Sequence, residues 1–180
     1  MISERFPVGV VVERVKAESR WADYVWRVSD VLPATLIAAP WTMLAETCPP
    51  GKEKPEKEKQ GASTRFYAGI TDLVAWAADT KVYKHNIEAP QPSVYVVLRK
   101  GGGPHGWSLL LATVDPSEAH SHADAGDDLV EAVPMPRPVF DWLSAFVAAH
   151  HVERKEWRRK RDRADPEALA IRRDRPAKES

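Results

Sequence analysis

Short runs of β-branched and aromatic residues, most of them ended by glycine or proline, fill the chain before its last helical pattern. Residues 6–13 read Phe-Pro-Val-Gly-Val-Val-Val-Glu, and residues 93–99 read Ser-Val-Tyr-Val-Val-Leu-Arg. Runs of this length and composition are typical of buried strands. No helical segments alternate regularly with them, so the order of elements argues against a parallel βαβ sheet and favours an antiparallel one.

Further strands follow from side-chain alternation and from turn residues. Within residues 21–31, Ala, Tyr, Trp and Val alternate with polar residues, which is the period of a half-buried strand. Residues 107–114 follow a glycine-rich segment and are predicted to form a hairpin with residues 93–99. Asp115 is predicted to cap a short helix that starts at Pro116. Further strands are expected at residues 35–37, 65–76 (with a turn near Gly69 and Asp72) and 129–133. Residues 82–86 are expected to form an irregular link or one helical turn.

One helical pattern closes the chain and begins at Pro138, a residue type favoured in the first turn of a helix. We expect it to continue to about Arg163, because Asp165 precedes a proline. The predicted fold is α+β: a small antiparallel, partly open β-barrel of about seven strands packed on this long C-terminal helix, as in pleckstrin-homology-like folds. The helix would bury the stripe of Phe140, Leu143, Phe146 and Val147.

Charge divides the chain into a domain and a tail. Residues 1–152 are predicted to form a single β-rich domain that includes the first half of the closing helix. Within it, residues 49–62 lack a large apolar side chain, so we expect a mobile charged loop. Residues 153–180 hold eleven Lys and Arg against seven Asp and Glu, a local net charge of +4, whereas the whole chain has 26 of each sign. We expect a basic helical extension with a frayed tail.

Residue types used in catalysis or metal binding do not form a recognised motif. His120 and His122 lie near several acids, but their spacing matches no metal motif, so we expect a solvated acidic loop and no metal. The glycines at 101–103 precede a strand rather than a helix, which favours a hairpin loop over a phosphate-binding loop. Cys48 has no basic neighbour except Lys52 and is interpreted as an incidental thiol. The sequence therefore predicts a protein that is not an enzyme and binds no cofactor.

Trp157 lies in the basic extension and leaves two interpretations open. An aromatic residue among arginines is typical of a helix that docks on an acidic surface. Alternatively, the indole folds back onto the β domain while the charged side chains are solvated. Acidic residues between the basic ones would repel phosphate, which argues against nucleic acid as the partner. The candidate partner-binding residues are Arg154, Trp157, Arg158, Arg159 and Arg161.

Several strings in the same order resemble a known family: residues 6–14, the segment with Trp21 and Trp26, and residues 92–99, 133–138 and 142–147. The chain is similar over roughly residues 6–160 to a small proteobacterial family of unknown function, typically encoded near formate dehydrogenase and molybdenum-cofactor genes. Some members are labelled molybdopterin-guanine dinucleotide biosynthesis proteins. That label fits poorly, because the first strand holds one glycine and no phosphate loop follows it. The resemblance implies a context in formate oxidation or in maturation of its molybdenum enzyme.

These observations lead to a functional hypothesis with one alternative. We expect a non-catalytic accessory protein or subunit, linked to formate dehydrogenase or its molybdenum-cofactor maturation, that acts by protein–protein interaction. The alternative is a small-molecule or cofactor-handling protein with a pocket between barrel and helix; a metal-dependent hydrolase using His120 and His122 is a more distant third. A cytoplasmic location is expected, because the sequence lacks a signal-peptide pattern, a membrane-length apolar stretch and a second cysteine.

Overall fold

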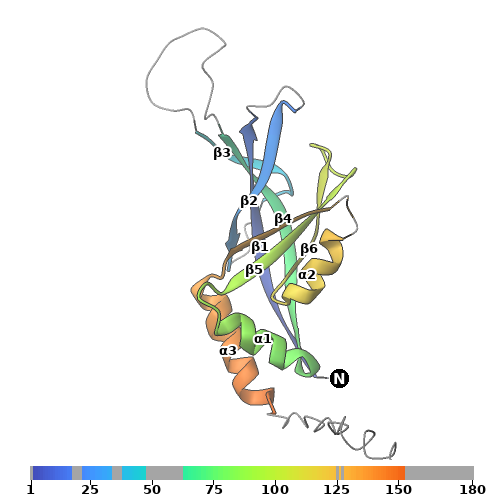
Figure 1. Cartoon of the computed structure of the whole chain (residues 1–180). Helices are drawn as coiled ribbons and strands as arrows, with labels where there is room; N and C mark the ends of the chain where they lie inside the picture. The colour runs from blue at the N-terminus through green and yellow to red at the C-terminus, as the bar shows by residue number, and fades with distance from the viewer. Residues whose placement is uncertain are drawn as a thin grey trace, which may run out of the picture.

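The strands form two antiparallel sheets, and the strands of one cross those of the other (Figure 1). In the computed structural model, the described residues are 2–17, 22–33, 38–47, 63–124, 126 and 128–152. The first sheet has the strand order β2-β1-β4-β3, with β1 at Ser3–Lys16, β2 at Tyr24–Leu32, β3 at Thr42–Thr47 and β4 at Ser63–Trp76. The second sheet has the order β6-β5-β7, with β5 at Ser93–Lys100, β6 at Trp107–Thr113 and β7 at Asp128–Pro134.

Strands β1 and β4 form the long axis of the first sheet. They are 14 residues long each and pair from Ser3 opposite Trp76 to Val15 opposite Ser63. The register shifts by one residue between Val10 and Val11. Valines fill the middle of β1, where both faces are covered, and their β-branched side chains suit a pleated, buried surface.

Three α-helices and one short 3-10 helix complete the described fold: η2 (Ala77–Asp79), α1 (Thr80–Ile87), α2 (Pro116–Ala123) and α3 (Arg137–His150). Asp115 caps α2 as predicted, because its Oδ1 accepts hydrogen bonds from the amides of Ser117 (2.7 Å) and Glu118 (3.4 Å). Helices α1 and α3 contact each other near the end of β4, and α2 lies against the second sheet. Trp142 of α3 packs on Phe6 of β1 with ring centroids 5.3 Å apart, which ties the closing helix to the first sheet.

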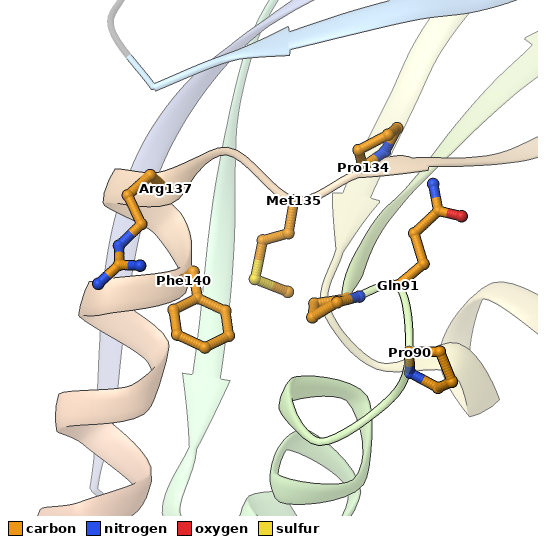
Figure 2. Close-up of a pocket in the computed structure, with 7 residues that line it drawn as sticks. Pro90, Gln91, Pro134, Met135, Arg137 and Phe140 are labelled. Atoms are coloured by element: carbon orange, nitrogen blue, oxygen red, sulfur yellow. The ribbon is translucent and has the colours of Figure 1, made fainter.

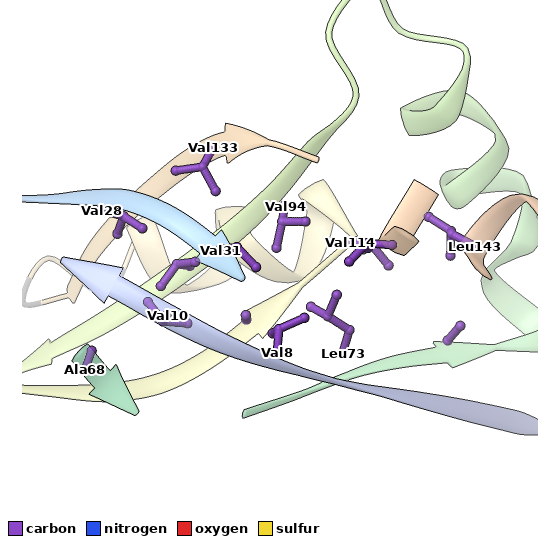
Figure 3. Packing of buried hydrophobic residues seen from close by; sticks show 14 of the residues in the cluster. Val8, Val10, Val28, Val31, Ala68, Leu73, Val94, Val114, Val133 and Leu143 are labelled. Carbon is purple, nitrogen blue, oxygen red and sulfur yellow. The ribbon is translucent and has the colours of Figure 1, made fainter. Parts of the chain in front are cut away.

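The core lies between the two sheets and consists largely of valine side chains. Figure 3 shows Val10 and Val31 of the first sheet near Val94 of the second, with Leu143 of α3 closing one end. All four side chains are almost completely removed from solvent. Each contributes about 1.5–3 kcal/mol relative to an exposed position, which makes this apolar layer the main source of stability.

The barrel prediction is wrong. The four-stranded and three-stranded sheets are separate hydrogen-bonded units and form neither a closed nor a partly open barrel of about seven strands. The long closing helix of that prediction is also not seen, because α3 ends at His150 and His151 already has an extended backbone (φ −76°, ψ 123°). Alternation predicts which face of a strand is buried, but it carries no information on which strands are neighbours.

Smaller boundaries differ as well. Residues 65–76 belong to one continuous strand without the predicted turn, and Gly69 (φ +137°) instead lies at the register shift between β1 and β4. The predicted irregular link at 82–86 is part of α1, and β3 was not predicted. The strand predicted at 35–37, the loop predicted at 49–62 and the extension predicted at 153–180 lie outside the described residues.

Candidate functional site

An aromatic cluster lies where the last residues of β1 pair with the first residues of β2 and β4, and the turn between β5 and β6 reaches it. We define this cluster as Tyr24, Trp26, Trp41, Phe66 and His105, together with Arg14, whose guanidinium lies against three of these rings. Strand register explains the arrangement. Arg14 is opposite Trp26 on one side, and Val12 is opposite Phe66 on the other, so these side chains share the face that forms the core farther along the sheet.

His105 packs against three rings of this cluster. The centroid of its imidazole lies 4.6 Å from that of Phe66, 5.5 Å from that of Trp26 and 5.8 Å from that of Trp41. Tilted and edge-on ring pairs at such distances each contribute about 0.5–1.5 kcal/mol beyond burial. The ring is therefore held against three aromatic neighbours that belong to the other sheet or to the segment before β3.

The glycine-rich turn between β5 and β6 allows His105 to reach the first sheet. Gly101, Gly103 and Gly106 have φ values of +98°, +71° and +76°, and the Gly101 amide donates to the Gly106 carbonyl at 2.9 Å. A Cβ atom on Gly103 would lie 2.2 Å from the Trp107 carbonyl oxygen, so only glycine fits there. The predicted hairpin of residues 93–99 and 107–114 is thus confirmed, and its turn positions a side chain of the candidate site.

Trp41 is held in a left-handed backbone conformation. Its φ of +65° is the one positive value among the described non-glycine residues. Such a conformation costs about 1–2 kcal/mol for a residue with a Cβ atom. The Trp41 amide donates a hydrogen bond to the Tyr67 carbonyl, and its indole stands edge-on to Trp26 with centroids 5.9 Å apart. Strain of this kind persists where surrounding contacts impose it and is frequent at binding sites.

Arg14 is the charged centre of the cluster. Its guanidinium carbon lies 4.5 Å from the ring centroid of Tyr24, 5.4 Å from that of Phe66 and 6.0 Å from that of Trp26. Cation–π contacts of this kind contribute about 0.5–2 kcal/mol. The Nε atom of Arg14 is buried without a hydrogen-bond partner, and no acid within the described part of the chain forms an ion pair with it. Among the described residues, the arrangement thus presents a cation that has aromatic neighbours but no anion.

Exposed apolar side chains flank the cluster. Tyr24 is 49% exposed and Met43 is 59% exposed, although Met43 is opposite the buried Phe66 in the pairing of β3 with β4. Leu44, the chain neighbour of Met43, is also exposed, whereas the exposed Val25 lies on the opposite face of β2. Concentrations of exposed apolar surface are typical of interaction sites.

A second surface feature is a shallow hollow of about 320 Å³ beside the start of α3. Figure 2 shows Met135 and Phe140 near the segment that carries Pro90 and Gln91. The Met135 amide donates to the Pro92 carbonyl at 2.8 Å, so the two linkers that form the hollow are joined. The lining consists of Pro90, Gln91, Pro92, Pro134, Met135, Arg137 and Phe140. Its one charged residue, Arg137, is already paired with Asp141 at 2.8 Å.

A hollow of about 370 Å³ lies between α1 and α3. It is lined by Lys84, Ile87, Glu88, Ser144, Val147, Ala148 and His151. The Ser144 hydroxyl is buried without a hydrogen-bond partner, and the His151 Nδ1 lies 3.2 Å from the Thr80 hydroxyl. Both hollows lie at helix surfaces, whereas the space between the sheets and α3 is filled by the apolar core.

The histidines considered as metal ligands lie on α2 rather than in a solvated loop. His120 is exposed, and the His122 Nδ1 lies 3.4 Å from the Asp128 carboxylate. Arg99 binds that carboxylate through two hydrogen bonds of 2.9 and 3.0 Å, which lower the pKa of Asp128 and raise the pKa of Arg99. Within the described ranges, no three His, Cys, Asp or Glu residues gather as a metal site would require. The group is an ion pair with a histidine beside it.

The predicted partner-binding residues, Arg154, Trp157, Arg158, Arg159 and Arg161, lie outside the described residues, as does Cys48. Their role stays a prediction. Arg14 was missed, because the first predicted strand ended at residue 13. The sequence did contain a signal for Arg14. It lies two positions after Val12, so if the strand continued, its side chain would share the face of that valine.

Comparison with known proteins gives one match. Residues 7–161 match the model of a family described as "Protein of unknown function (DUF3305)". No curated protein and no solved structure matches the chain. None of the helices in the described ranges is long and apolar enough to cross a membrane.

Proposed function

The chain belongs to the DUF3305 family of proteins of unknown function, and we propose that it is a non-catalytic accessory protein that acts by binding another protein. The aromatic cluster around Arg14 is the observation that carries this proposal. Tyrosine, tryptophan and arginine are the residue types that most often dominate the binding energy of protein interfaces. Here they stand together on a rigid sheet, next to exposed Tyr24 and Met43.

Rigidity of the surface supports the proposal. Arg14, Trp26 and Phe66 lie on hydrogen-bonded strands, and His105 is held by three ring contacts. Side chains that are ordered before binding lose less conformational entropy when a partner arrives. A partner would thus gain most of the contact free energy of these rings.

The partner in this proposal is a subunit of formate dehydrogenase or a factor that matures its molybdenum cofactor, and the encounter takes place in the cytoplasm. The resemblance of residues 6–14, 92–99 and 142–147 to a family encoded beside such genes supports this choice. The basic segment 153–180 would add a second, electrostatic contact with an acidic surface of the same partner.

Affinity purification of the full chain from its native host, with mass spectrometry of the recovered proteins, tests the proposal. Tyr24→Ser combined with Met43→Ser should reduce recovery of formate dehydrogenase subunits or maturation factors about tenfold, since the two changes remove contact surface worth at least 1.4 kcal/mol. Ile70→Ser is the matched control, because Ile70 is an equally exposed apolar residue (53%) of the same sheet outside the cluster. Equal recovery with all three proteins would contradict the proposal. Deletion of residues 153–180 separates the contribution of the basic segment.

A second candidate is a small-molecule-handling protein that uses the hollow between α1 and α3. The observation in its favour is the buried Ser144 hydroxyl, which lacks a partner at the edge of that hollow. Native mass spectrometry of protein purified from its host should then detect a bound small molecule. Ala148→Trp, which fills the hollow, should remove it, and an unliganded wild-type mass would reject this candidate.

A further inference from the structure

We infer that Arg14 and His105 receive one carboxylate, supplied by an acidic side chain within an apolar segment of the partner protein. This inference rests on the proposed function, because it names the chemical group that the aromatic cluster recognises.

Arg14 differs from the other arginines by what surrounds it. Among the described arginines, Arg5, Arg65, Arg99 and Arg137 each have a carboxylate within 4.0 Å. Arg27 has none in the described ranges, but it is exposed to water. Arg14 is half-buried and has none there either, and its Nε is buried and unpaired. An unpaired buried donor costs about 1–3 kcal/mol, and more when it is charged. A carboxylate bound at the terminal nitrogens would give this guanidinium the anion that it lacks among the described residues.

The guanidinium of Arg14 and the imidazole of His105 both lie near the rings of Phe66 and Trp26. Arg14 lies 5.4 Å from the Phe66 centroid and 6.0 Å from the Trp26 centroid, and His105 lies 4.6 and 5.5 Å from the same two centroids. Arg14 as a whole is half-buried rather than enclosed, so its guanidinium can donate from its open side to an incoming group. A planar carboxylate can accept two parallel hydrogen bonds from one edge of a guanidinium.

The charge of the site fits a monoanion better than a phosphate. Arg14 is the one arginine of the cluster, and the exposed Lys16, opposite Tyr24 on the same face, adds a second cation at its margin. Phosphate recognition in proteins usually employs clusters of arginines. Glu46 lies on the same face, because it is opposite Thr64, which in turn is opposite Arg14. Two strand spacings, roughly 10 Å, separate it from Arg14, so its charge would add repulsion toward a dianion.

The exposure of Tyr24 and Met43 indicates which residues should flank the acidic residue of the partner. Both lie at the margin of the cluster, and apolar side chains on either side of the partner's Asp or Glu would cover them. Burial of these neighbours would exclude water from the ion pair and strengthen it. The expected recognition element is one acidic residue with apolar neighbours.

Nuclear magnetic resonance of the full chain tests this with the blocked tripeptide acetyl-Leu-Glu-Leu-amide as the probe. The ¹H–¹⁵N signal of the Arg14 Nε–H group and the indole signal of Trp26 should shift and saturate. The peptide with Gln in place of Glu should leave both signals unchanged. Arg14→Lys keeps a cation near the rings but loses the planar donor pair, and it should weaken binding about tenfold by the Trp26 signal. Arg65→Lys, on the opposite face, should bind as the wild type does.

Absence of any shift with the Glu peptide, or equal shifts with the Gln peptide, would overturn the inference. Tighter binding of inorganic phosphate would overturn the choice of a carboxylate. Failure here remains distinct from failure of the proposed function. If Arg14→Lys retains the cellular partner that the Tyr24 and Met43 changes release, the carboxylate site is refuted and the interface stands. If the peptide binds but no variant loses a partner, the interface is refuted.

Discussion

Replacement of Asn86 by alanine should destabilise the protein, because it removes the hydrogen bonds between helix α1 and the second sheet. The side chain is 4% exposed. Its Nδ2 donates to the carbonyl oxygens of Ser93 (2.9 Å) and Val114 (2.8 Å), and its Oδ1 accepts from the Ser93 amide (3.0 Å). The side-chain amide of Asn86 therefore joins α1 to the start of β5 and to Val114, the residue that follows β6. It supplies a hydrogen-bond partner for two backbone carbonyls and one backbone amide.

The size of the effect follows from these three bonds. A hydrogen bond in a folded protein contributes about 1 kcal/mol net, so Asn86→Ala should lower the free energy of unfolding by about 3 kcal/mol. That is a large part of the roughly 5–15 kcal/mol by which domains are stable. At about 2–4 °C per kcal/mol for a chain of this length, the Tm should fall by about 6–12 °C. Asn86→Asp should lose a comparable amount at neutral pH, since a carboxylate would face two carbonyl oxygens.

Urea unfolding followed by tryptophan fluorescence provides the measurement. His85→Ala is the matched control, because His85 is the exposed neighbour on the same helix and should change stability by less than about 0.5 kcal/mol. A loss below about 1 kcal/mol for Asn86→Ala would refute the reasoning, because a single typical hydrogen bond would already account for it. Equal losses in both variants would refute it as well.

Three further changes probe the sheets and the hairpin. Glu131→Ala should lower the free energy of unfolding by about 1–3 kcal/mol in urea titrations, because the Glu131 carboxylate accepts a hydrogen bond from the Val28 amide of the other sheet. Glu131→Gln keeps an acceptor and should lose clearly less stability. Gly103→Ala should lower the Tm more than Gly106→Ala, since both have similar φ values (+71° and +76°) but only at Gly103 would a Cβ meet an atom at 2.2 Å; equal shifts would contradict this. The pKa of Asp128 is lowered chiefly by its hydrogen bonds to Arg99, so the stability from this pair is present above about pH 4 and is lost as the pH falls through the lowered pKa. Asp128→Asn should be less stable than the wild type at pH 7, and the difference should shrink below about pH 4.

Local patterns in the chain predicted several elements correctly. The alternation and glycines of residues 93–114 predicted the β5–β6 hairpin, Asp115-Pro116 predicted the start of α2, and the apolar stripe from Phe140 to Val147 predicted α3. Each of these signals depends on residues within a few positions of one another. Helix caps, turn conformations and side-chain periods are local properties, so a sequence can display them directly.

The site could not be predicted in the same way. Arg14, Trp41, Phe66 and His105 come from four separate segments, and the residues that pair between β1 and β4 are 48 to 73 positions apart in the chain. The same alternation would suit several pairings, and packing of the whole core selects one of them. The sequence by itself therefore determined the type of several elements and much of the buried face of α3, where Leu143, Phe146 and Val147 are buried as predicted but Val139 is buried in place of Phe140. Only the tertiary structure decided that the strands form two sheets instead of a barrel, and that an arginine with no acid partner among the described residues lies against aromatic rings of neighbouring strands.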